Sequence, residues 1–124
     1  MSVLPSRDRE YLAEHKVAFE EVAAPQKAVI LRGYAVPRGR FDHGQSDILI
    51  LLPDGYPLVP PDMFFALPWL RLPNGRYPNC ADQPFQFANG NWQRWSRHNP
   101  QWRPGIDGIW TMLRRIDVAL EKAA

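Results

Sequence analysis

The chain of 124 residues has a single cysteine, Cys80, no long apolar run and almost no excess charge. One cysteine excludes an internal disulfide and a cysteine-rich zinc site, and it is typical of a reducing compartment. No apolar segment approaches the roughly 20 residues that a membrane-spanning helix needs. The first eight residues also lack the apolar core of a secretory signal. We therefore expect a cytoplasmic protein that does not enter a membrane.

Metal-binding and cofactor-binding patterns are also missing. His15, His43 and His98 are scattered and have no ligand-spaced cysteines or carboxylates around them. No glycine-rich phosphate loop is present, so any ATP would be consumed by a partner. A net charge of +2 is too small to indicate nucleic-acid binding by itself. We expect no metal, no cofactor and no nucleic-acid partner.

The composition that is present indicates one ordinary globular domain over residues 1–124. Hydrophobic residues make up 45% of the chain and charged residues 23%, close to the averages of globular proteins. Proline is abundant, with 13 residues, most of them between positions 53 and 104. Proline ends helices and cannot donate a hydrogen bond within a central strand. That half of the chain is therefore predicted to run in turns and extended segments.

Hydrophobic spacing predicts a helix near each end of the chain. In residues 6–22 the positions that repeat every three or four residues are Leu12, His15, Phe19 and Val22. Residues 106–122 form the second predicted helix, and its apolar face consists of Ile109, Trp110, Leu113, Ile116 and Leu120. Asp107 lies favourably near the start of this second helix.

Three β-rich runs lie between the two helices, at residues 28–36, 47–52 and 62–67. The middle run is apolar on both faces, which predicts a strand in the interior of a sheet with a helix packed over it. Residues 68–105 show no clear period, and so long an irregular passage in a compact domain is usually functional. The predicted fold class is α+β, with an N-terminal helix, an antiparallel β-meander, a long irregular loop and a C-terminal helix.

One stretch within the irregular passage is unusually dense in reactive and aromatic side chains. Residues 92–105 contain three Trp, three Arg, one His and one Ser in fourteen positions. Indole and guanidinium groups at this density need a groove to pack in or a partner to hold. We predict that the stretch shapes a reactive ledge that carries Ser96.

Three motifs resemble those of ubiquitin-conjugating enzymes, and they occur in the same order. Residues 56–65, Tyr-Pro-Leu-Val-Pro-Pro-Asp-Met-Phe-Phe, resemble the family signature YPxxPPxVxF, with Met63 as the one departure. Residues 77–79, Tyr-Pro-Asn, resemble the HPN tripeptide, although Tyr77 replaces its histidine. Residues 102–104, Trp-Arg-Pro, resemble the WxP motif before the helix that follows the active site. The resemblance covers nearly the whole chain.

The details are similar to a bacterial branch of this superfamily, prokaryotic family E. The resemblance implies a UBC-like fold and an acyl carrier that takes the C-terminus of a ubiquitin-like protein from a ThiF-like activating enzyme and passes it to an amine. Relatives are encoded beside such partners and beside peptidases, in gene clusters associated with phage defence. The alternative is a non-catalytic UBC-fold module that binds a ubiquitin-like protein or scaffolds its partners.

Two residues are candidates for the nucleophile of acyl transfer. The family's nucleophilic cysteine lies roughly eight residues after the Asn of HPN and roughly eight residues before the Trp of WxP. Ser96 lies six residues before Trp102, whereas Cys80 lies twenty-two before it. Ser96 is therefore predicted to accept the acyl group as an oxyester, with Cys80 and a thioester as the alternative.

A serine nucleophile needs a base, and His98 lies two residues after Ser96. Side chains two positions apart in an extended segment project to the same face, so His98 is the predicted general base. The sequence shows no third group that would orient the imidazole. Asn79, retained from the HPN motif, is predicted either to support the loop or to stabilise the oxyanion. In the plainer alternative, Ser96 caps a turn and His98 bonds to backbone.

The remaining candidates are substrate-binding residues, namely Arg94, Arg97, Trp95 and Trp102. The two arginines could bind the carrier's terminal carboxylate or a tetrahedral oxyanion. The tryptophans have two further interpretations. At least two of the three in this stretch could pack beneath the ledge, or the aromatics interleaved with arginines could stack on single-stranded nucleic acid.

Overall fold

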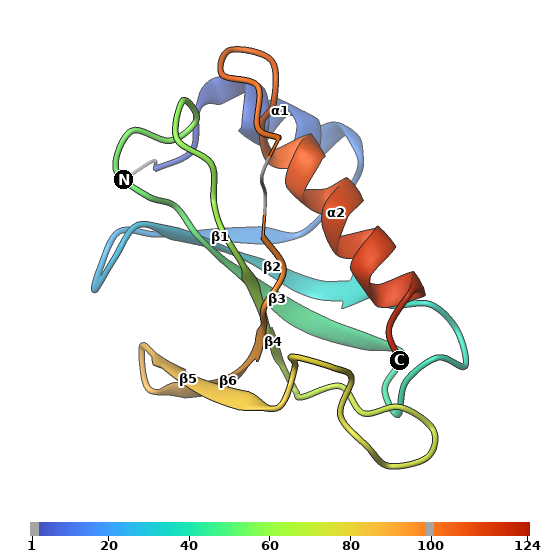
Figure 1. Cartoon of the computed structure of the whole chain (residues 1–124). Helices are drawn as coiled ribbons and strands as arrows, with labels where there is room; N and C mark the ends of the chain where they lie inside the picture. Colours follow the sequence, from blue (N-terminus) through green and yellow to red (C-terminus); the bar gives the residue numbers. More distant parts are fainter. Residues whose placement is uncertain (1–2, 99–100) are drawn as a thin grey trace.

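The computed structural model describes residues 3–98 and 101–124, which form one antiparallel sheet and two helices (Figure 1). The elements in chain order are α1 (Ser6–Glu14), β1 (Phe19–Val22), β2 (Ala28–Ala35), β3 (Gln45–Leu51), β4 (Phe64–Leu67), β5 (Gln83–Phe87), β6 (Gly90–Trp95) and α2 (Ile109–Glu121). The six strands are ordered β1-β2-β3-β4-β6-β5. Figure 1 shows both helices on the same face of the sheet. The predicted α+β class is confirmed.

The first helix is shorter than the sequence predicted. It ends at Glu14, and Lys16 adopts a left-handed conformation with φ of 56°. The chain then forms β1, which pairs with β2 from Phe19 opposite Leu31 to Val22 opposite Ala28. The prediction of helix through Val22 was wrong because pairing with the outer edge of β2 satisfies backbone groups on both strands, and this outweighs a helical spacing of apolar residues.

The passage predicted to be irregular contains a β-hairpin, formed by β5 and β6. The hairpin was not predicted because Pro84 argues against a strand. However, β5 is the edge strand of the sheet, where proline is tolerated. Ala88 and Asn89 join the strands with φ angles of 46° and 66°, the combination of a two-residue type I′ turn. The hairpin places β6 directly beside β4 and carries the chain to Ser96.

The interior position predicted for residues 47–52 is confirmed by β3, which lies between β2 and β4. Ile48 and Ile50 pack in the main core beneath the helices, while Leu49 packs in a second apolar cluster on the opposite face. Trp95 at the end of β6 is fully buried in the main core, with its ring stacked on Phe64 at a centroid distance of 5.3 Å. The end of β6 is thus firmly anchored.

No helix within residues 3–98 and 101–124 is long and apolar enough to cross a membrane.

A buried amide joins β6 to the loop that follows β4. Gln93 is fully buried, and its Oε1 accepts from the Leu70 N–H at 2.7 Å and the Trp95 indole N–H at 3.1 Å. Its Nε2 donates to the carbonyls of Leu70 at 2.9 Å and Ala81 at 2.8 Å. Two accepted and two donated bonds use the full capacity of the amide. The loop from Leu70 to Ala81 is therefore held against β6.

Replacing this amide should cost substantial stability. We expect Gln93→Met to lower the free energy of unfolding by about 3 kcal/mol or more, because it keeps the side-chain length and leaves four buried polar groups without partners. Chemical denaturation measures this. Gln86→Met, on exposed β5, is the matched control and should cost below about 1 kcal/mol. Equal losses in the two variants would contradict the assignment.

Candidate active site

Ser96 and Cys80, the two candidate nucleophiles, lie side by side. Ser96 follows the last residue of β6, and its backbone N–H donates to the carbonyl oxygen of Cys80 at 3.0 Å. Ser96 is half-buried and Cys80 is exposed. The two residues are sixteen positions apart in the sequence, and this hydrogen bond between their backbones holds them next to each other. The fold brings the two candidates to one site, although their spacing from Trp102 differs.

Cys80 belongs to a tight turn that also carries Asn79. The N–H of Ala81 donates to the carbonyl of Pro78 at 3.1 Å, and Cys80 has a left-handed φ of 58°. The N–H of Asn79 donates to the carbonyl of Ala124 at 2.9 Å. The two central residues of the turn, Asn79 and Cys80, are thus each hydrogen-bonded to another part of the chain. Asn79 itself is exposed beside the candidate nucleophiles.

Arg97 joins this turn to Ser96. Its Nη1 donates to the carbonyl of Asn79 and to that of Ser96, both at 3.2 Å. The guanidinium carbon lies 5.2 Å from the centre of the Trp95 ring, a cation–π arrangement. Only one of its nitrogens makes these hydrogen bonds, so the other donors of the fork can face a carboxylate or an oxyanion.

The backbone bends sharply at Ser96. The N–H of Arg97 donates to the carbonyl of Trp95 at 2.9 Å, which closes a three-residue turn centred on Ser96. The extended geometry assumed for the Ser96 and His98 pair is therefore interrupted. The hydrogen bond that closes this turn joins two backbone groups and does not involve the Ser96 hydroxyl.

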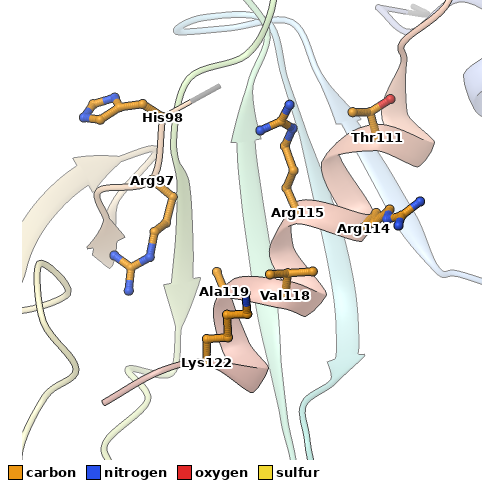
Figure 2. Close-up of a pocket in the computed structure, with 8 residues that line it drawn as sticks. All are labelled: Arg97, His98, Thr111, Arg114, Arg115, Val118, Ala119 and Lys122. Carbon is orange, nitrogen blue, oxygen red and sulfur yellow. The ribbon is translucent and has the colours of Figure 1, made fainter. Parts of the chain in front are cut away.

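His98 has a carboxylate partner that the sequence did not reveal. Its Nδ1 lies 2.8 Å from Oδ1 of Asp62, and the two side chains are 70% and 60% exposed. Because an ionised carboxylate only accepts, Nδ1 carries the hydrogen, and in the neutral imidazole Nε2 then has the lone pair of a base. Figure 2 shows the His98 ring directed away from α2. Asp62 lies 36 positions earlier, in the proline-rich motif before β4, so no local pattern connects the pair.

The other predicted substrate-binding residues have contacts of a different kind. Trp95 is fully buried, and Trp102 is half-buried with its indole N–H donating to the carbonyl of Pro57 at 2.9 Å. Trp92 is also buried, on the opposite face of the sheet. Arg94 lies two residues after Trp92 in β6 and shares that face. The contacts of the three indoles are those of packing residues, and the buried faces of Trp92 and Trp95 cannot stack on a base.

The segment between Ser96 and α2 is fastened at its far end by Asp107. This buried carboxylate accepts from the backbone N–H and the guanidinium of Arg103, at 2.8 and 2.9 Å, and from the hydroxyl of Thr111 at 3.0 Å. The hydrogen bond from the Arg103 side chain is the main cause that lowers the pKa of Asp107 to about 2. The sequence placed Asp107 near the helix start but did not identify its partners.

Within the described residues no group of three or more His, Cys, Asp or Glu side chains is arranged to hold a metal ion. Asn99 and Pro100, which belong to the dense stretch, lie outside the described residues.

The family model described as prokaryotic E2 family E matches residues 4–123, which is nearly the whole chain. Neither the comparison with curated proteins nor that with solved structures gives a match.

The Asp107 contacts predict a specific dependence of stability on pH. The folded-state pKa of about 2 lies below the ordinary value of 3.8, so the stabilisation is present above about pH 4 and is lost as the pH falls toward 2. We expect Asp107→Asn to melt at a lower temperature than the parent protein at pH 6. At pH 2.5 the difference between the two melting temperatures should be smaller. Arg103→Gln should reproduce much of this loss, and the two changes together should cost less than their sum. Full additivity would rule out the proposed coupling.

Proposed function

The chain belongs to prokaryotic E2 family E, and from this membership we propose that it carries the C-terminal acyl group of a ubiquitin-like protein to an acceptor amine. Membership supports a conjugating role in general, and the finer chemistry is our proposal. Ser96 accepts the acyl group as an oxyester, His98 serves as general base, and Asp62 orients the imidazole. The observation that carries the proposal is the meeting of Ser96, Cys80, Asn79 and Arg97 at the end of β6.

The transfer consists of two acyl substitutions. In the first, Oγ of Ser96 attacks the activated carboxyl carbon of the carrier, an ester C–O bond forms, and the bond to the activating group breaks. His98 takes the hydroxyl proton, and a proton is returned to the leaving group. In the second, an amine attacks the ester carbon, an amide forms, and the oxygen of Ser96 leaves and regains a proton. The cycle leaves the serine unchanged.

Charge in both steps develops on the carbonyl oxygen, which needs a hydrogen-bond donor. Arg97 is the proposed donor, because its guanidinium is held between Asn79 and Ser96. The Asn79 amide has two proposed roles, support of the loop or stabilisation of the oxyanion. Its N–H and carbonyl are both engaged by the rest of the chain, which supports the first role, while its exposed side chain is compatible with the second.

Cys80 is the alternative nucleophile. Its exposed thiol lies in the turn whose carbonyl accepts from Ser96, and a thioester would be the more reactive intermediate. The imidazole two residues from Ser96 favours the serine, since a hydroxyl requires a base and a thiol depends on it less.

The proposed partners follow from the family. A ThiF-like activating enzyme consumes ATP and supplies the acyl group, a ubiquitin-like protein is the carrier, and an associated peptidase belongs to the same set. The proposed setting is the bacterial cytoplasm, which the single cysteine supports, in defence against phage.

The chemistry of the covalent intermediate tests the nucleophile. The protein is charged with its activating enzyme, carrier and ATP, and the adduct is treated with thiol reductant or hydroxylamine. We expect an adduct that survives reductant, yields to hydroxylamine, persists in Cys80→Ser and is absent in Ser96→Ala. An adduct lost with reductant and in Cys80→Ser would assign the transfer to the thiol. Binding of the carrier without any adduct would instead indicate a non-catalytic module.

The roles of His98 and Asp62 are tested by single-turnover rates of adduct formation. We expect His98→Ala to slow the reaction by about 100-fold or more, because it removes the general base. Asp62→Asn should slow it by a smaller factor, and it should have no further effect in the His98→Ala background, because the carboxylate acts through the imidazole. Asp54→Asn, an exposed carboxylate in an earlier turn, is the matched control and should leave the rate unchanged. Independent effects of the two substitutions would refute the pairing.

A further inference from the structure

A groove with several cations runs between Arg97 and helix α2 (Figure 2). It has a volume of about 450 Å³ and is lined from α2 mainly by Arg114, Arg115, Val118 and Lys122. These positions recur at three and four residues, so they share one face of the helix. We call this feature the α2 groove. Its residues on α2 have no role in the acyl transfer steps described above, whereas Arg97 and His98 line the groove and also belong to the candidate active site.

The α2 groove concentrates positive charge. Arg97, Arg114, Arg115 and Lys122 are basic side chains, and no carboxylate of the described residues lines the groove. Within the described residues none of the four has an ion pair within 4.0 Å. The chain as a whole carries a net charge of only +2, so this excess is a local feature. Such a groove attracts an anionic ligand.

Two further observations concern contacts inside the α2 groove. Nε of Arg115 is buried, and no atom of the described residues accepts a hydrogen bond from it. Val118 is 40% exposed and lies between the cations, with Ala119 beside it. The surface therefore offers guanidinium donors around a small apolar strip.

We propose that the α2 groove binds an extended, acidic peptide segment of a partner protein. Arg114 and Lys122 are eight residues apart on the helix, about 12 Å along its axis. An extended peptide covers this distance with about four residues, since each adds about 3.3 Å. Carboxylates would face the cations, and an apolar side chain would cover Val118.

Nucleic acid fits this surface less well. Binding of single strands relies on several aromatic side chains on which successive bases stack, and among the described residues that line the α2 groove only His98 has an aromatic ring, which is directed away from α2 (Figure 2). A lone phosphate ion would meet one or two cations but would leave the apolar strip uncovered. The alternation of charge and apolar surface along the helix favours a peptide.

The α2 groove ends beside the candidate active site, because Arg97 lines it and also contacts Asn79 and Ser96. A bound acidic segment would bring the residues that follow it close to the nucleophile. This consequence for transfer rests on the proposed function, whereas peptide binding itself does not. The binding experiment therefore uses the chain alone, without activating enzyme or carrier.

Binding is measured by fluorescence anisotropy of a labelled hexapeptide, Glu-Glu-Leu-Asp-Glu-Leu, titrated with the full chain. We expect saturable binding that weakens as the salt concentration rises. The double variant Arg114→Glu with Lys122→Glu should weaken it at least tenfold. The matched control, Arg38→Glu with Arg76→Glu, makes the same change in net charge at exposed turns elsewhere and should weaken it less than threefold. Thermal melting verifies that both variants fold.

The apolar strip has a separate test. Val118→Ser should weaken binding of this hexapeptide and should have little effect on a version in which both leucines are replaced by alanine. Equal weakening by the groove variant and its control would overturn the proposal, because binding would then follow net charge alone. It would also be overturned if a single-stranded hexanucleotide bound more tightly and displaced the peptide, or if inorganic phosphate displaced it at similar concentrations.

Discussion

The arrangement of the candidate site depends on the buried amide of Gln93. One side chain in β6 satisfies the backbone of Leu70 and Ala81, at the two ends of the loop that follows β4. Without this bridge nothing in the sheet pairing would hold the loop, because Leu70 and Ala81 belong to no strand. The Gln93 bridge places the turn that carries Asn79 and Cys80 against the end of β6, next to Ser96. A shift of the loop along β6 would break the hydrogen bonds of this buried amide, so the amide also fixes the position of the loop relative to the strand.

Much of the fold could be predicted from hydrophobic period, and the failures have physical causes. α2 was predictable because its apolar spacing follows one period over many residues, and β3 was predictable because a short continuous apolar run indicates a strand buried on both faces. Residues 19–22 were predicted as helix, yet they form β1, since the exposed edge of β2 offers partners that a local pattern cannot include. The hairpin of β5 and β6 was missed because Pro84 argues against a strand unless one knows that the strand lies at an edge.

The site could be predicted only where motif spacing carried information. Spacing from the WxP motif singled out Ser96, and the structure brings Cys80 to the same place through a backbone bond that no spacing rule contains. Asp62 was not predictable as the partner of His98, because 36 positions separate them and an isolated carboxylate after two prolines has no distinctive signal. The arginines were treated alike, yet strand alternation puts Arg94 on the face of Trp92, whereas the bend at Ser96 turns Arg97 toward Asn79.

The contacts of residues 96–98 and 101–107 anchor the chain on both sides of the candidate site. Near one end, Ser96 is fixed through the Cys80 carbonyl and Arg97, and near the other, Trp102 bonds to Pro57 while Arg103 bonds to Asp107. Reacting groups must be held within a fraction of an ångström for their positions to lower a barrier, and anchors at both ends restrict the motion of the candidate nucleophile. Both anchors draw on buried partners, Trp95 beneath Arg97 and Asp107 at the start of α2, so that the exposed reactive groups are supported by the core.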